Sequence, residues 1–485
     1  MKIKYLIASA LLTLSLAGRA NVNDCNHNIP NPTSIMITND YDYAKAWQEV
    51  RKLDSDLKQR EALAKVKEIR QNALKEKNYL QISRAFIYII DYSTRLEESD
   101  EWKNELKLLR STADDAPDAP KSFLYLLLGH MYNEYRDDLS YRFYGRTDVE
   151  NDQNDDIETW SLPRINREIA DCYRKAVANP KATQAVPLDD WKEAVQKENE
   201  GYSTLYCKTL YDFIALNTIK RYCDRNREQN DFSYKDIELV SDADKFINFQ
   251  PKNNDTWSSE NLRLSLYQEL LRAHKNDKTP IAYEFINILR LNYYKMRSVN
   301  EDADDTYLKA LEAIKSRYPN DPEITPAASY HIAQQYRNRG MLKEAHDLAM
   351  ETLKKYPRSS ANFGQASLSL AHDLEIKKLY LTGETAVAIN TPFPMKLEYT
   401  NLEKIYLHIY KVYDIDDYNR NQYDRVEYIK KKLEEVRSEE VQLIDNKDYK
   451  TLSSEIILDG LPKGYYVILA SNDQDYIHEK SDVIS

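Results

Sequence analysis

The spacing of hydrophobic residues changes once along this chain, near Thr385. Before that point apolar residues recur every three or four positions, which is the period of an amphipathic helix. After it they alternate with polar residues, as in strands that have two unlike faces. We therefore expect a helical region over residues 39–382, followed by a β-domain over residues 383–485.

The helical region is expected to consist of helices that pack by one or two faces. Each candidate segment carries an apolar stripe at positions i, i+3, i+4 and i+7. The candidate helices are 57–75, 79–96, 121–135, 203–222, 257–274, 281–297 and 303–318. Thr279 and Pro280 have the residue types of a helix start, with a capping hydroxyl followed by proline at the first helical position.

The clearest repeat lies between Pro326 and Pro357. It predicts two helices that face each other, with Gly340 in the turn between them. The facing residues are Ile332, Ala333 and Tyr336 in the first helix, and Leu342, Ala345, Leu348 and Leu353 in the second. This pattern is similar to a tetratricopeptide repeat, although Ser329 stands where that repeat usually has a large aromatic residue. We expect an α-solenoid of such helical hairpins.

The β-domain is expected to be an antiparallel sandwich, because about 100 residues contain several closely spaced strands. The predicted strands are 385–391, 395–400, 404–413, 449–458 and 464–471, with a helix over 422–438 before the last two. Residues 464–470 are apolar nearly throughout, which indicates a strand buried on both faces. Residues 482–485 resemble the start of another strand, so we expect the sandwich to be incomplete and the natural polypeptide to continue beyond Ser485.

The N-terminus has the pattern of a secretory signal over residues 1–20. Two lysines precede an apolar run over 5–16, and Gly18-Arg19-Ala20 is a small-x-small cleavage site. A lipid anchor would need cysteine at position 19. We therefore expect an exported protein without a lipid anchor, located in the periplasm or the outer cell envelope, with a flexible leader over residues 21–38 and no transmembrane segment after the signal is removed.

Charge and composition narrow the possible partners. The chain has 68 basic and 79 acidic residues, and loss of the signal removes Lys2, Lys4 and Arg19, so the net charge falls from -11 to -14. Nucleic acid is then an unsuitable partner, because phosphate binding needs a basic face. The mean hydropathy of -0.72 excludes a multi-span membrane protein. Proteins are the expected partners.

Four cysteines are too few and too scattered for a disulfide framework. They are Cys25, Cys172, Cys207 and Cys223. We expect Cys207 and Cys223 on one continuous helix, where sixteen residues place them roughly 24 Å apart, beyond the reach of a disulfide. A bond between Cys172 and Cys207 stays open as an alternative, but reduced core cysteines are the favoured interpretation.

No catalytic, cofactor-binding or metal-binding residue can be assigned from the sequence, and we do not expect an enzyme. The nine glycines form neither a nucleotide-binding fingerprint nor a nucleophile elbow, and the eight histidines include no H-E-x-x-H pair. The densest acidic run, 148–156, fails as a calcium loop because Gln153 and Thr159 stand where glycine and glutamate are needed. A solvated loop is expected there.

The order of several short segments resembles the N-terminal region of Bacteroidetes-type alpha-2-macroglobulin family proteins, in which an exported helical extension precedes macroglobulin-type β-domains. The segments that carry the resemblance are 141–147 with 156–160, 203–206 with 210–213, 265–271, 397–402 with 405–410, and 461–467. The resemblance implies that this chain is the scaffold and docking part of a broad-range protease trap. Its β-domain would be the first macroglobulin-like module.

Members of that family capture a protease by closing around it, and many bond it through a thioester at Cys-x-Glu-Gln. None of the four cysteines here lies in that sequence, so the resemblance places no trapping chemistry in residues 1–485. The alternative hypothesis is a freestanding repeat protein of the cell envelope that binds another protein. A glycan-binding protein of the outer membrane is disfavoured by Arg19 and by only five tryptophans.

Overall fold

The computed structural model describes residues 41–96, 99–138, 143, 145–149, 154, 156–195, 205–226, 234–252, 255, 257–359, 362–421 and 425–474. The expected signal, leader and last strand lie outside these residues. Within them, no helix has the length and apolar character needed to cross a bilayer. The chain divides into two compact units, one ending at Tyr318 and the other beginning at Pro319.

The first unit is helical throughout its described part. Its α-helices are α1 (Tyr43–Ser55), α2 (Gln59–Glu76), α3 (Tyr79–Arg95), α4 (Ser99–Asp115), α5 (Asp118–Asp138), α7 (Leu162–Val177), α8 (Pro180–Gln184), α9 (Lys192–Val195), α10 (Leu210–Thr218), α11 (Ala243–Asn248), α12 (Ser259–His274), α13 (Ile281–Arg297) and α14 (Ala303–Arg317). Short 3₁₀ turns η1 (Ile157–Thr159), η2 (Leu188–Trp191) and η4 (Ile237–Val240) lie between them, and η3 (Ile219–Cys223) is a π-helix.

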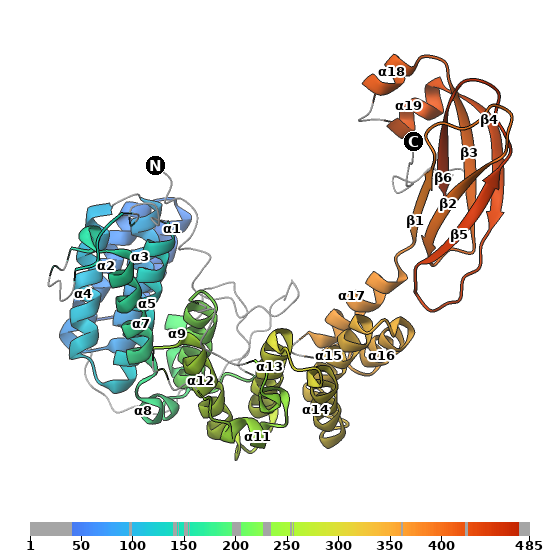
Figure 1. The fold of residues 1–485 in the computed structure, drawn as a ribbon. Coiled ribbons are helices and arrows are strands. Elements are labelled where there is room, and N and C mark those ends of the chain that lie inside the picture. The colour runs from blue at the N-terminus through green and yellow to red at the C-terminus, as the bar shows by residue number, and fades with distance from the viewer. Residues whose placement is uncertain are drawn as a thin grey trace. The chain divides into compact units, whose positions relative to one another are not determined.

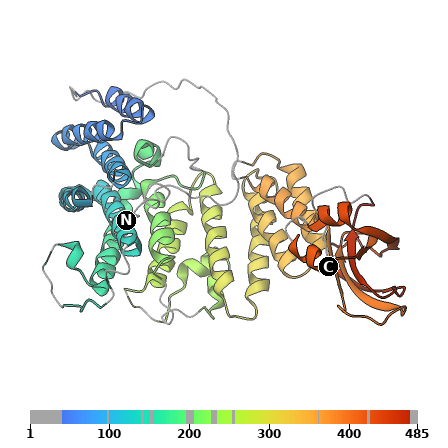
Figure 2. The same ribbon diagram turned by 90° about the horizontal axis from the view of Figure 1, so that it is seen from above.

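Neighbouring helices of this unit pack side by side, as Figures 1 and 2 show for α2 with α3 and for α5 with α7. The apolar stripes that predict the helices are the buried faces. In α2, for example, Leu63, Val66 and Ile69 are buried in a core that also contains Trp47 of α1 and Ile89 of α3. Five of the seven predicted helices are therefore confirmed to within two residues at each end, and the predicted helix 121–135 lies inside the longer helix α5.

The predicted helix over 203–222 is wrong at its beginning. Helix α10 begins only at Leu210, because Thr209 caps it: the Thr209 hydroxyl accepts from the Asp212 amide, and the Asp212 carboxylate accepts from the Thr209 amide. Such a reciprocal capping box fixes a helix start. The predicted start of α13 is also wrong in detail. Pro280 is the N-cap residue instead of the first helical residue, and no side-chain hydrogen bond caps this helix.

The second unit begins with three helices, α15 (Ile324–Asn338), α16 (Leu342–Lys355) and α17 (Phe363–Glu375). The facing helices expected between Pro326 and Pro357 are confirmed as α15 and α16. Gly340 lies between them with a φ of +74°, in the left-handed region that glycine adopts without strain. Ala333 and Ala345 are fully buried where the two helices meet, so small side chains allow the close approach.

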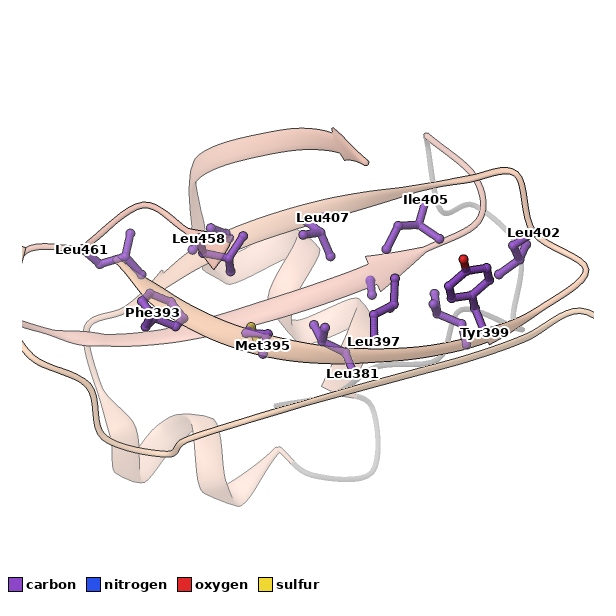
Figure 3. Packing of buried hydrophobic residues seen from close by; sticks show 13 residues of the cluster. Leu381, Phe393, Met395, Leu397, Tyr399, Leu402, Ile405, Leu407, Leu458 and Leu461 are labelled. Carbon is purple, nitrogen blue, oxygen red and sulfur yellow. The ribbon is translucent and has the colours of Figure 1, made fainter. Parts of the chain in front are cut away.

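Two three-stranded antiparallel sheets follow the helices. Their strands are β1 (Lys378–Gly383), β2 (Phe393–Thr400), β3 (Lys404–Val412), β4 (Glu434–Gln442), β5 (Leu452–Leu458) and β6 (Tyr465–Ser471), in the orders β1-β2-β5 and β4-β3-β6. One hydrophobic core contains side chains from both sheets, including Leu381 and Leu397 from one and Ile405 and Leu407 from the other (Figure 3). The predicted antiparallel β-region at the C-terminus is confirmed.

Two details of the predicted β-region are wrong. Residues 385–391 form a loop, and the first strand is β1, which lies before Thr385. The alternating residues Val387 and Ile389 are 38% and 55% exposed, so their side chains are not part of a core. The helix predicted over 422–438 is also wrong in its second half. Helix α19 (Arg425–Lys432) ends early because the following residues pair with β3 as strand β4.

Strand β6 is covered on both faces, as its apolar sequence predicts. Tyr466, Ile468 and Ala470 belong to the core that the two sheets share. Val467 and Leu469 point to the other face, into a smaller core with side chains of α18 (Ile415–Arg420) and α19. The two short helices therefore shield the outer face of this sheet (Figure 1).

Candidate functional site

The helical unit has a groove of about 600 Å³ beside α4. Its walls are α4 and the start of α7, and η1 closes one side. The residues that line it are Lys103, Asn104, Leu106, Lys107, Arg110, Ser111, Asp114, Tyr132, Asp156, Ile157, Trp160, Arg164 and Glu168. A volume of this size is typical of sites that bind a ligand or a short peptide segment.

The floor of the groove is aromatic. Tyr132 and Trp160 are both 4% exposed, and their ring centroids lie 5.6 Å apart. The Trp160 indole N–H donates to the backbone carbonyl of Asn154 at 2.7 Å, and Arg164 places its guanidinium 4.7 Å from the indole centroid. These contacts fix the indole in one orientation, so the floor is a preformed apolar surface with a polar rim.

Charged side chains surround this floor. Arg110 pairs with Glu168 at 2.6 Å, and Lys103 pairs with Glu158 at 2.6 Å. Lys107 is exposed and makes no ion pair with any described residue. Burial raises the pKa of Tyr132 to about 12, so its phenol stays protonated at neutral pH. Among the described residues, Lys107 is thus an exposed cation without an ion pair that lines the groove beside the aromatic floor.

The groove combines paired charges with a protonated phenol. Arg110 and Glu168 neutralise each other, and the Tyr132 phenol is too weak an acid to act as a nucleophile near pH 7. Within the described residues, no three His, Cys, Asp or Glu side chains are grouped so that they could hold a metal ion. An extended protein segment with an acidic and an aromatic side chain has the chemistry that this groove complements.

The acidic run that resembles a calcium loop in composition is organised by protein groups where the structure describes it. Asp148 accepts from Arg167 at 2.9 and 3.0 Å and from the Ser161 hydroxyl at 2.7 Å. The hydrogen bonds from Arg167 and Ser161 lower the pKa of Asp148 to about 2. Asp156 caps η1 by accepting from the Glu158 amide. Both described carboxylates are therefore bound by protein groups.

The described cysteines are free thiols inside the helical core. Cys172, Cys207 and Cys223 are all buried and form no disulfide, which confirms the reduced-core prediction for these three, while Cys25 lies outside the described residues. Cys207 precedes α10 instead of lying on it, so the expected continuous helix with Cys223 is wrong. Burial raises the pKa of Cys223 to about 12 and also raises the pKa of Cys172.

A second feature of interest joins helices to sheets within the second unit. Asn401, which has a φ of +56°, donates its side-chain amide to the carbonyls of Leu374 and Ile376 at the end of α17. Tyr449 from the loop between β4 and β5 stacks on His346 of α16, with ring centroids 4.4 Å apart. These contacts join α17 and α16 to loops of the sheets.

Neither a protein-family model nor a curated protein matches this sequence. The sequence did not reveal the groove, because its residues come from segments up to 65 positions apart and show no common motif. Its one visible signal is the segment 156–160, which contributes Asp156, Ile157 and Trp160 to the lining.

Proposed function

We propose that this chain is the docking and scaffold part of an exported, macroglobulin-type protease inhibitor. In this proposal the helical unit binds a protein partner through the groove beside α4. The two sheets of the second unit are the first macroglobulin-like module, and the helices before them are tetratricopeptide-like hairpins. The chain itself carries out no covalent chemistry.

The observation that supports the proposal most is the joint in the second unit. A module that transmits or resists force needs its parts fixed to one another, and Asn401 and Tyr449 provide two such fixed points. Asn401 satisfies two carbonyls at a helix end, which are otherwise unpaired. A helical hairpin anchored to a pair of sheets is suited to a scaffold that positions further β-modules.

The cysteines support a scaffold role as well. Thioester capture in the family that the chain resembles needs the sequence Cys-x-Glu-Gln, and none of the four cysteines lies in it. Cys172 and Cys223 are fully buried, and burial raises the pKa of both thiols. They pack as small apolar side chains inside the helical core. In this proposal any thioester belongs to another part of the inhibitor.

The second candidate is a freestanding envelope protein that binds a partner in the same groove. It is favoured by the free Lys107 beside the fixed indole of Trp160, because such a site needs no additional domain.

The mass of the native polypeptide in cell fractions, detected with an antibody to residues 41–474, distinguishes the two candidates. The inhibitor proposal predicts a species much larger than 56.9 kDa, whereas a stable species near that mass would contradict it and favour the freestanding protein.

A further inference from the structure

A small cavity inside the helical unit contains two polar side chains without adequate partners. It has a volume of about 30 Å³ and is lined by Ile87, Phe123, Leu126, Leu127, His130, Ala194, Phe213, Asn217 and Arg221. Every lining residue is at most 8% exposed. A cavity of this volume has room for roughly two water-sized particles, so it can accept a small ion but no larger metabolite.

Arg221 brings an uncompensated positive charge to this cavity. Its guanidinium is 8% exposed, and its Nε donates to the Asn217 side-chain oxygen at 3.2 Å. No carboxylate of the described residues lies within ion-pair distance of it. The nearest candidate, Glu134, is engaged with Arg225 at 2.6 Å. A buried charge of this kind is costly unless a counter-charge lies beside it.

His130 provides a second donor at the same cavity. Its ring is 3% exposed and neither ring nitrogen makes a hydrogen bond, although Glu134 Oε1 lies 3.7 Å from Nδ1. Burial, together with the charges of Arg221 and Arg225, lowers the pKa of His130 well below its ordinary value. The ring is therefore neutral, and in either tautomer it has one N–H to donate.

The rest of the lining also suits an anion. Phe123 and Phe213 lie with their ring centroids 6.1 Å apart, and aromatic ring edges carry partial positive charge. Arg221 lies on η3, the π-helix that directly follows α10. Single π-helical turns of this type occur often at functional sites, because they redirect a side chain that a regular helix would place elsewhere.

We propose that this cavity is a binding site for a small monovalent anion of halide size, held between the Arg221 guanidinium and a ring N–H of His130. The anion supplies the counter-charge that the described residues do not. It also fills space between α3, α5, α9 and α10, so its binding stabilises the packing of these four helices. If the anion binds only the folded state, the free energy of unfolding increases with anion concentration. Once the anion concentration is well above the dissociation constant, this increase is proportional to the logarithm of the concentration.

The direct test is crystallisation of the mature chain with sodium bromide in place of chloride, followed by an anomalous difference map. The proposal predicts a bromide peak in contact with Arg221 and His130. A map without bromide there, in crystals that bind bromide elsewhere, would overturn it.

A solution test uses thermal unfolding in sodium chloride and in sodium gluconate at equal ionic strength, since gluconate is too large for the cavity. We expect chloride to raise the melting temperature and gluconate not to do so. Arg221→Met removes the guanidinium and should abolish the difference, while the exposed control Arg60→Met should keep it. Equal melting temperatures of the unsubstituted chain in the two salts would contradict the proposal, and the bromide map still decides if Arg221→Met does not fold.

Discussion

Several of the most buried side chains in the helical unit are charged, and their partners explain why they are tolerated. Arg290 is fully buried, yet it donates to the carbonyls of Leu239 and Ser241 and to the Asn287 side chain. It therefore fixes η4 to α13. Burial lowers the pKa of Arg290 to about 9, and these acceptors hold the group in place as a cation near neutral pH.

His274 is the residue for which the structure predicts a measurable pH effect. Its Nε2 lies 3.0 Å from Asp212 and its Nδ1 lies 2.7 Å from Asp277. Burial alone lowers the pKa of His274, but hydrogen bonds and charge interactions with the two carboxylates outweigh burial and raise it above 6.5. Because the folded pKa is raised, protonation stabilises the fold fully below the unfolded pKa, and this contribution is lost as the pH rises through the folded pKa.

We expect His274→Gln to lower the free energy of unfolding by about 1.5–3 kcal/mol at pH 5.5, the range for hydrogen bonds to charged groups. The deficit should shrink as the pH rises above the folded pKa of His274. Urea denaturation of both proteins between pH 5.5 and 9 measures this. The exposed residue His372 is not hydrogen-bonded to a carboxylate in the described structure, so His372→Gln is the control. A deficit that stays constant over this range would contradict the account.

At the scale of elements, helices were predictable where one apolar stripe faces one core. Helix α2 illustrates this, because the stripe of Leu63, Val66 and Ile69 in the sequence is the buried face in the structure. Prediction failed where a segment forms a strand because it pairs with another strand. Strand β4 has helical spacing through Val436, but its register is fixed by pairing with β3, and no local pattern contains that information.

The groove beside α4 could not be predicted for a related reason. Lys107 and Trp160 lie 53 positions apart, and each has an ordinary local role, one on an exposed helix face and one in a buried core. Only the packing of α4 beside η1 and α7 makes them parts of one surface. The floor and the charged rim are therefore properties of the tertiary structure.

If the groove is the docking surface, reversal of its free charge should weaken docking. We expect Lys107→Glu in the native protein to lower the fraction retained in the envelope fraction about fivefold, because a matched charge contributes on the order of 1 kcal/mol at a rim. Lys181→Glu is the matched control, since Lys181 is equally exposed and does not line the groove. Equal retention of the two variants would exclude the groove as the docking surface.

At the scale of the whole molecule, the sequence predicts the change from helices to antiparallel strands, and the structure confirms it. What it could not predict is the division of the chain at Tyr318 and Pro319, which places α15, α16 and α17 in the same compact unit as the sheets. Periodicity assigns these helices to the helical region. Their grouping with the sheets depends on contacts such as those of Asn401 and Tyr449, which join segments distant in sequence.

We propose that this chain is part of a protease inhibitor that encloses its target. The measurement that tests it most directly compares two activities of one protease in the presence of the native protein purified from cells. Enclosure blocks a large substrate but leaves the active site open to a small one. The account predicts that cleavage of a protein substrate is lost while cleavage of a short chromogenic peptide persists. Undiminished cleavage of the protein substrate, over a panel of proteases of different specificity, would contradict it.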